Sequence, residues 1–408
     1  AAAGAFCVAD AMLWERAVGA LAHLGPRLGA LGAAAVLFLL PFIALGAVFP
    51  LAVKLHTRAV EEVGRRSGSL SAVSAVGSLL GAILAWFWLV PTLSIETTFA
   101  GCAAVLVMAD ATVLIVARGS NRAGITLLLL SCGPHFVSAG PLPEGVLLRR
   151  GSLFGPLEVR QSGILRYLIV ANTVQGIARG DPVRSHMPHT RLISQMLAGS
   201  IPHVGGKVLL IGLGAGFIPR ELDPIPCETV EIDPAIVGAA TRFFAFDPAR
   251  HPVHVADGRA FLLSARERYE AIVIDALRGG DMPFHLLTRE FFELVRRRLH
   301  PGGILVVNYQ GFLLGTEGLL ARSVEKTLRA VFKEVDICFH RDPPENAVAI
   351  FAAHGPDVFV ESSPVRGYEV RQTFLADELP ARVLTDSRNP VELWSAQLDC
   401  RRRLSRAP

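Results

Sequence analysis

Cysteines at metal-binding spacing are absent from this sequence. Its six cysteines lie far apart with no CxxC pair, which argues against a zinc site and against a disulfide framework. The net charge of +4 is also small for 408 residues. The arginine triplets at 296–298 and 401–403 are typical of solvated helix ends or lipid contacts rather than of a nucleic-acid surface. We therefore expect neither a bound metal nor a nucleic-acid partner.

Charged residues are scarce in the N-terminal part of the chain. Four stretches there are each long enough to cross a hydrocarbon core of about 30 Å, which takes about 20 helical residues. They are residues 28–53, 67–95, 97–117 and 123–143, and Asp110 is the only Asp, Glu, Lys or Arg within them. We expect about four transmembrane spans, and contact with a lipid bilayer, in residues 1–143.

Apolar runs and glycines alternate in residues 207–233. The apolar run 208–211 predicts a strand, a glycine-rich turn follows, and a second apolar strand ends at Glu231. At the carboxyl edge of a parallel sheet, such glycines let the backbone approach a nucleotide, and the acid binds the ribose hydroxyls. The glycines of this expected nucleotide-binding turn are Gly212, Gly214 and Gly216.

Two prolines limit the helix that follows this turn. Pro219 and Pro224 leave room for only a short helix, whereas a dinucleotide fold needs a long helix that faces a pyrophosphate. This pattern favours S-adenosylmethionine or a related nucleoside over a dinucleotide.

Acids fall at the ends of three successive predicted strands. Helices and strands alternate after Glu231, as they do in a doubly wound parallel sheet, and the strand ends of such a sheet form one ligand crevice. We expect Glu231 on the ribose and Asp257 on the adenine amine, with Gly258 opening the next helix. Asp275 should lie nearest the reacting centre, and Asp233 should cap a helix beside the same site and belong to the cofactor-binding residues. Each acid alone is also compatible with a helix-capping role.

Residues 144–182 have the pattern of short strands joined by turns. Alternating apolar positions there predict half-buried hairpins, which form a small β subdomain ahead of the main sheet. The predicted parts are a transmembrane helical region at 1–143, the β subdomain at 144–182, a Rossmann-like nucleotide-binding catalytic domain at 183–360 and a C-terminal extension at 361–408.

These motifs resemble the spermidine synthase family, and in particular its membrane-fused bacterial homologues. In the soluble enzymes a GGGDGG turn, an acid on the ribose, a D-G or D-A pair at the adenine and a DSSDP loop with the catalytic aspartate follow one another. Here they correspond to residues 212–217, Glu231, residues 257–258 and Asp275 onward. The segments DALRGGDMPFHLLTREFF and LTDSRNPVE resemble the membrane-fused homologues, and Gln175 matches the glutamine of the LDGxxQ segment.

The resemblance implies a class I S-adenosylmethionine-dependent transferase fold. It further implies S-adenosylmethionine or its decarboxylated form as cosubstrate, a polyamine-like amine as acceptor, and a homodimer formed through the β subdomain. We place the protein in the bacterial inner membrane, with the catalytic domain in the cytoplasm, because the presumed cosubstrate is made there.

The sequence departs from the family pattern at three places. Ala215 stands where the soluble synthases have the turn aspartate that holds the amine of decarboxylated S-adenosylmethionine. Arg278 replaces the second aspartate of DSSDP, with Asp281 three residues on as its substitute. Residues 188–190, Pro-His-Thr, replace the family's Tyr-His-Glu and keep only His189.

Our leading hypothesis is an integral-membrane enzyme similar to the aminopropyltransferases. Asp275 would orient the attacking amine and accept its proton, and Asp281 would bind the acceptor. One alternative is a methyltransferase or a related enzyme that uses whole S-adenosylmethionine. Another is a transporter or sensor whose nucleotide-binding domain has no catalytic activity.

Overall fold

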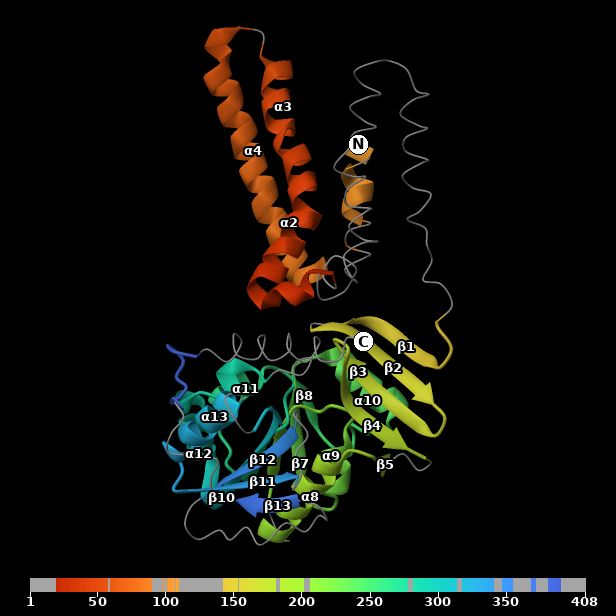
Figure 1. The fold of residues 1–408 in the computed structure, drawn as a ribbon, viewed down its shortest axis with the longest axis vertical. Helices are drawn as coiled ribbons and strands as arrows, with labels where there is room; N and C mark the ends of the chain where they lie inside the picture. Colours follow the sequence, from red (N-terminus) through yellow and green to blue (C-terminus); the bar gives the residue numbers. More distant parts are fainter. Residues whose placement is uncertain are drawn as a thin grey trace. The chain divides into compact units, whose positions relative to one another are not determined.

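The computed structural model describes residues 20–57, 59–89, 98, 101–106, 108–109, 142–152, 154–180, 184–201, 206–277, 282–313, 318–340, 347–354, 368–371 and 381–389. The chain divides into two units (Figure 1). The first comprises Ala1–Pro141 with Asp399–Pro408, and the second comprises Leu142–Leu398.

The described part of the first unit is helical. Pro41 lies inside the helix Gly25–Gly46. The helix axis bends by 44° between Leu31–Leu39 and Pro41–Lys54. Proline causes such bends because it has no N–H to donate and its ring clashes with the preceding turn. The elements are η1 (Ala22–Leu24), α2 (Gly25–Gly46), α3 (Val48–His56), η2 (Val60–Glu62), α4 (Val63–Leu84) and the π-helical turn η3 (Ala85–Leu89).

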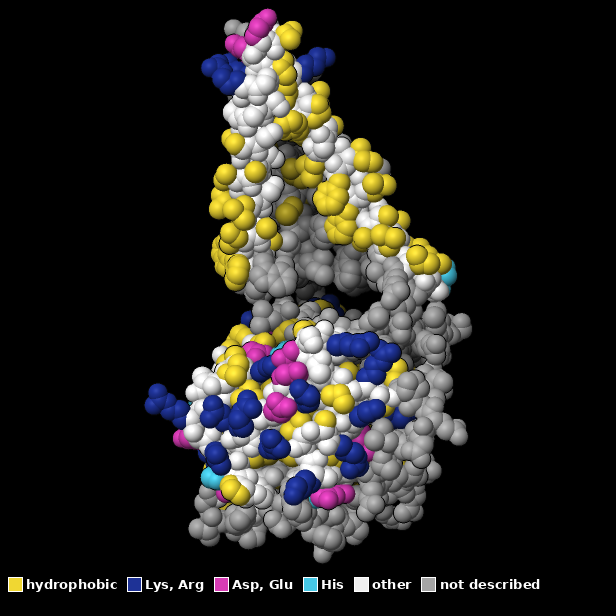
Figure 2. All heavy atoms as spheres, turned by 90° about the vertical axis from the view of Figure 1, so that its left-hand side faces the viewer, with side chains coloured by type: hydrophobic (Ala, Val, Ile, Leu, Met, Phe, Trp, Pro, Cys, Tyr) yellow, Lys and Arg dark blue, Asp and Glu magenta, His cyan; other side chains and the backbone are white. Residues whose placement is uncertain are grey.

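Many apolar side chains on these helices face outward, although Ala33 and Leu37 of α2 are buried. Val73 of α4 is 71% exposed, α4 has no buried residue, and Figure 2 shows hydrophobic side chains along the visible helical surfaces. Within the described ranges, one helical stretch, Val60–Leu89, is long and apolar enough to span a membrane, and the bent pair would make a second. The predicted spans at 97–117 and 123–143 lie mostly outside the described residues.

A five-stranded antiparallel sheet opens the second unit, with its strands in chain order. The predicted hairpins are confirmed, and the turn after β2 lies at residues 163–164. Leu168 and Val170 are the buried side chains of β3, whereas Tyr167 and Ile169 are half-buried. The strands are β1 (Val146–Ser152), β2 (Gly155–Ser162), β3 (Leu165–Val170), β4 (Thr173–Arg179) and β5 (Arg184–Ser185).

The main sheet has the strand order β13-β11-β12-β10-β9-β6-β7-β8. Strands β6 to β10 pair in parallel, whereas β12 pairs antiparallel with both β10 and β11. All four residues of β6 are buried, as expected of a central parallel strand covered on both faces. The strands are β6 (Val208–Ile211), β7 (Cys227–Glu231), β8 (Val253–Val255), β9 (Tyr269–Ile274), β10 (Leu299–Gly311), β11 (Glu334–His340), β12 (Ala347–His354) and β13 (Tyr368–Arg371).

Helices cover both faces of this sheet. Leu192 of α8 and Ile218 of α9 pack with one face, whereas α11, α12 and α13 pack with the other. Ala239 of α10 packs against the small sheet, so α10 joins the two sheets. The helices are α8 (Pro188–Ser200), α9 (Phe217–Glu221), α10 (Pro234–Phe243), α11 (Gly258–Ser264), η4 (Phe284–Leu286), α12 (Arg289–Arg298) and α13 (Leu319–Arg329).

Strand β13 lies in the segment that the sequence assigned to a C-terminal extension. It pairs antiparallel with β11, so the sheet continues past the predicted boundary at residue 360. Four residues are too few for a clear alternating pattern, and their partner strand is about thirty residues earlier in the chain, which is why the sequence did not predict this strand.

Candidate functional site

A glycine turn ends strand β6. Gly212, Gly214 and Gly216 all have positive φ, at 97°, 52° and 74°. A Cβ on Gly212 would overlap the backbone carbonyl of Asp275, so this position requires glycine for space as well as for conformation. The turn therefore brings the ends of β6 and β9 into close contact.

A pocket opens at the carboxyl edge of β6, β7 and β9. Open parallel α/β sheets bind their ligands at this edge. Side chains from β4, α8 and the loop before η4 complete its wall. The predicted site residues that line it are Gln175, His189, Gly212, Gly214, Glu231, Asp257, Gly258 and Asp275.

Glu231 is fixed by backbone donors at the end of β7. Its Oε2 accepts a hydrogen bond from the N–H of Leu213 at 2.9 Å, and its Oε1 accepts one from the N–H of Asp233 at 2.9 Å. The side chain is 4% exposed, and burial raises the pKa of Glu231 to about 7. An acid held in this way is preorganised to accept hydrogen bonds from ligand hydroxyls.

Asp257 joins a helix cap to the pocket wall. Its Oδ1 accepts from the N–H of Ala260 at 2.9 Å and thereby caps α11, while its Oδ2 lies 2.9 Å from Nε2 of His285. The hydrogen bond to His285 lowers the pKa of Asp257. Capping uses Oδ1 alone, so it does not prevent Oδ2, which pairs with His285 of the pocket wall, from also accepting a hydrogen bond from a ligand.

Asp275 follows β9 and faces two polar side chains. Nδ2 of Asn308, on β10, donates to Oδ1 of Asp275 at 2.6 Å. His189 lies close enough that its charge lowers the pKa of Asp275. Burial raises the pKa of Asp275, and the same cause lowers the pKa of His189. A carboxylate with a raised pKa is better suited to take up a proton than an exposed one.

Two buried polar atoms in the pocket wall have no hydrogen-bond partner among the described residues. They are Nε2 of Gln175, a donor, and Oδ1 of Asn308, an acceptor. Asn308 is 1% exposed, so its free oxygen carries a desolvation cost that a ligand could relieve. The pocket thus offers one donor and one acceptor in addition to its acids.

Two predicted cofactor residues do not line the pocket. Asp233 is turned to α10, where its Oδ1 accepts from the N–H of Ala235 at 2.8 Å as an N-cap. Gly216 begins α9 and lies against Phe246, so its role is to permit the turn. Asp281, the predicted acceptor-binding acid, lies outside the described residues.

Ala215 is packed rather than open to the pocket. It is buried, and a Cβ added at Gly176 of β4 would come 2.6 Å from the Cβ of Ala215. The small sheet therefore approaches the glycine turn closely at this point, and residue 215 presents no carboxylate there.

The sequence did not predict two residues of the site. Asn308 follows the apolar run 304–307 inside β10, which continues to Gly311, so a polar residue directly after that run was the available signal. His285 belongs to the HLLT segment, but nothing in the sequence indicates that it meets Asp257.

In the part of the chain that the structure describes, no three His, Cys, Asp or Glu side chains converge as metal ligands would.

Residues 188–347 match the family model described as "Spermine/spermidine synthase domain". A probable polyamine aminopropyl transferase of Bifidobacterium longum (strain NCC 2705) is 32% identical over 141 residues, 34% of this chain and 31% of that protein. A polyamine aminopropyltransferase of Vibrio vulnificus (strain CMCP6) is 34% identical over 134 residues, 31% of this chain and 44% of that protein. Putrescine N-methyltransferase 2 of Nicotiana tabacum is 33% identical over 156 residues, 36% of this chain and 43% of that protein. The chain thus spans less than half the length of these curated relatives.

Solved structures are also similar. A probable spermidine synthase from Corynebacterium glutamicum ATCC 13032 has a TM-score of 0.47 at 19% identity, covering 57% of this chain and 91% of that chain. A spermidine synthase in complex with the transition state analogue AdoDATO has a TM-score of 0.39 at 18% identity, covering 64% of this chain and 88% of that chain.

Proposed function

We propose that this chain, whose residues 188–347 match the spermine/spermidine synthase domain, transfers an aminopropyl group from decarboxylated S-adenosylmethionine to a polyamine-like amine. The observation that carries the proposal is the convergence of Glu231, Asp257 and Asp275 on one pocket beside the glycine turn. The first two suit a nucleoside, and the third suits an amine.

In the proposed reaction, an amine nitrogen attacks the methylene carbon next to the sulfonium sulfur. A new C–N bond forms while the C–S bond breaks, its electron pair stays on sulfur, and methylthioadenosine leaves. A free amine has a pKa near 10, as lysine does, so it must lose a proton before or during attack. Asp275 would orient the amine and accept this proton, and Asn308 would hold the carboxylate in place.

A methyl transfer to an amine is the second candidate. Two observations favour it: Ala215 presents no carboxylate to the amine of a decarboxylated donor, and putrescine N-methyltransferases are among the similar proteins. The same pocket and the same proton acceptor would serve this reaction, and S-adenosylhomocysteine would be the product.

We further propose that residues 1–143 hold the enzyme in a bacterial inner membrane, with the catalytic domain in the cytoplasm. The outward apolar side chains of α4 support this placement, since a bilayer is the solvent that suits them. Carbonate extraction tests it: the intact chain should stay with the membrane fraction. A homodimer formed through the small sheet stays a prediction, and light scattering in detergent checks it.

Mass spectrometry of the nucleoside product decides between the two reactions. Detergent-purified protein would receive either S-adenosylmethionine or its decarboxylated form, with a panel of polyamines. Methylthioadenosine from the decarboxylated donor supports the aminopropyl transfer, whereas S-adenosylhomocysteine supports methyl transfer. Binding of either donor without any product would contradict both.

A further inference from the structure

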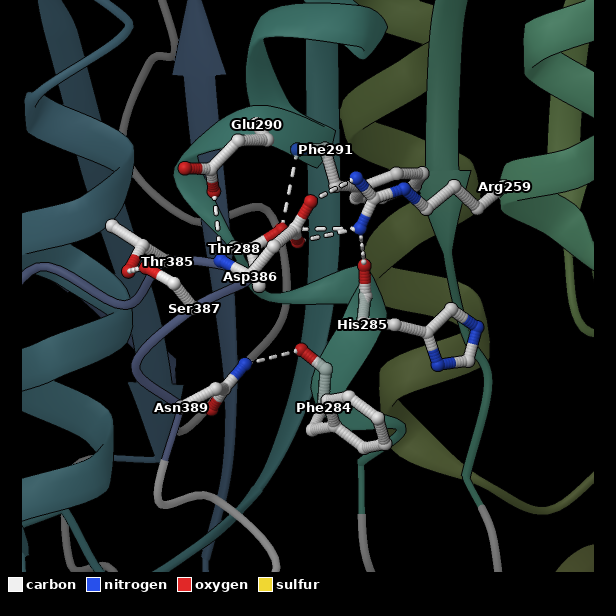
Figure 3. A network of polar contacts seen from close by, with 10 residues as sticks. All are labelled: Arg259, Phe284, His285, Thr288, Glu290, Phe291, Thr385, Asp386, Ser387 and Asn389. Carbon is white, nitrogen blue, oxygen red and sulfur yellow. Dashed lines mark hydrogen bonds and ion pairs between the residues drawn. The ribbon is translucent and has the colours of Figure 1, made fainter.

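The segment 384–389 packs beside residues 284–288, at the wall of the pocket, although it lies about one hundred residues later in the chain (Figure 3). Leu384 anchors it: the side chain is fully buried in the core of the main sheet, and its N–H donates to Oγ1 of Thr327 at 2.9 Å. The carbonyl of Leu384 accepts from the N–H of Arg289, at the start of α12, at 2.8 Å. The segment is therefore built into the fold.

Asp386, in this segment, holds Arg259 with both carboxylate oxygens. Nη1 of Arg259 donates to Oδ1 at 2.7 Å, and Nη2 donates to Oδ2 at 2.5 Å. The N–H of Asp386 donates to Oε2 of Glu290 at 3.0 Å. A two-point pair of this kind fixes the plane of the guanidinium as well as its distance.

The same guanidinium reaches the turn that carries His285. Nη1 of Arg259 donates to the backbone carbonyl of His285 at 3.1 Å, and Figure 3 shows this carbonyl and the Asp386 carboxylate on one guanidinium. Nδ2 of Asn389 donates to the carbonyl of Phe284 at 2.7 Å, so the segment holds this turn at a second point. The ring of His285 is in turn hydrogen-bonded to Asp257, and both line the pocket.

Arg259 needs this partner. Its side chain is only 22% exposed, so water alone cannot solvate the guanidinium fully if the carboxylate is removed. Asp386 itself is 45% exposed, which means that its substitution leaves no cavity in the core.

We infer that Asp386 is a positioning residue for the nucleoside end of the pocket: through Arg259 it fixes the turn of His285, and through His285 it fixes Asp257. The inference rests on the proposed function for the identity of the ligand, but the chain of contacts is independent of it. Asp386 touches no pocket atom itself and acts through the other three residues.

Calorimetry with methylthioadenosine tests the inference on the detergent-purified protein. Asp386→Asn should weaken binding by about three- to tenfold, within the range for coupled neighbouring groups. Asp386→Glu, which keeps the charge, should recover at least part of the loss. Glu267→Gln is the matched control, because it breaks another ion pair of 2.7 Å, with Lys207, away from the pocket.

A double-mutant cycle separates positioning from general stability. In a His285→Ala background, Asp386→Asn should change affinity by less than about twofold, because the route through His285 is gone. An equal loss in both backgrounds would overturn the inference, since it would mean that Asp386 acts by another route.

Amide hydrogen exchange without any ligand keeps the test separate from the proposed function. Asp386→Asn should speed exchange in residues 284–288, and Glu267→Gln should not. Unchanged exchange there would overturn the inference even if the nucleoside binds. A further outcome is that the parent protein fails to bind the nucleoside while Asp386→Asn still speeds exchange in residues 284–288. That result would keep the positioning role and overturn the proposed function.

Discussion

The two ends of the pocket hold their acids in different ways. At the nucleoside end, Glu231 and Asp257 accept hydrogen bonds from backbone N–H groups within two or three residues, or across the glycine turn, and Asp257 has the ring of His285 as a further partner. At the reacting end, the partners of Asp275 are side chains, Asn308 of β10 and His189 of α8. A backbone donor cannot be lost by substitution, whereas a side-chain donor can. The hold on Glu231 should therefore tolerate side-chain changes around it, whereas the positions of Asp257, through His285, and of Asp275 should be sensitive to substitution.

The largest expected effect sharpens this contrast. Asp275→Asn should keep nucleoside affinity while turnover falls by roughly 10² to 10⁴, the range for general-base catalysis. Calorimetry and steady-state kinetics on the same preparation check it. Asp336→Asn, which changes another aspartate that pairs with a histidine, is the control and should leave turnover unchanged. Normal turnover in Asp275→Asn would remove Asp275 from the reacting end.

The buried acid at the nucleoside end should make stability depend on pH. Burial raises the pKa of Glu231 from its ordinary value of 4.5 to about 7, so between these values the folded state binds a proton that the unfolded state has lost. The contribution of Glu231 to stability therefore falls as pH rises from 4.5 to 7, by an amount on the order of 3 kcal/mol, and is constant above that window. In thermal unfolding measured across this pH window, Glu231→Gln should remove the fall of stability with pH, and Glu267→Gln should not. An unchanged slope would contradict the raised pKa.

The same substitution tests the ligand role of the acid. Glu231→Gln should weaken methylthioadenosine binding by about 1 to 3 kcal/mol, the cost of losing a charge-assisted hydrogen bond. Calorimetry above pH 8, where the parent acid is ionised, gives the cleanest value. Equal affinity in parent and variant would place the ribose elsewhere.

The smallest effect concerns the support of Asp275. Asn308→Ala removes a hydrogen bond that lowers the pKa of Asp275, so that pKa should rise further. A proton acceptor works in its ionised form, and the acid limb of the kcat/KM profile should therefore move to higher pH. Turnover near pH 7 should fall by roughly three- to tenfold, the cost of one such bond. Gln310→Ala changes another pocket-lining side chain two residues along the same strand and tests whether any change in this wall has the same effect; a shift of equal size there would contradict a specific role for Asn308.

The contrast also explains what the sequence could predict. Strand-end acids, the glycine turn and the caps at Asp233 and Asp257 depend on neighbours a few residues away, and such local patterns are visible in a sequence. The cap expected of Asp233 is present, whereas its ligand role stays a prediction, because a cap and a ligand acid share the same strand-end position. The role of a capping acid is decided by which way its side chain turns.

Long-range partners were beyond prediction for a physical reason. Asn308 meets Asp275 across 33 residues, and Asp386 meets Arg259 across 127. Such pairs depend on strand order and on the packing of several helices, none of which leaves a periodic pattern in the residues concerned. The pairing of β13 with β11 escaped prediction for the same reason.

The distance along the chain between Arg259 and Asp386 has a consequence for biosynthesis. A ribosome adds roughly 5 to 20 residues per second, so roughly 6 to 25 s pass between the synthesis of the arginine and that of its aspartate partner. During that interval the glycine turn and its acids already exist, but the turn of His285 lacks its outer support. Nascent chains should acquire affinity for the nucleoside in two stages, with the second stage waiting for the segment 384–389, which supports the pocket wall from outside.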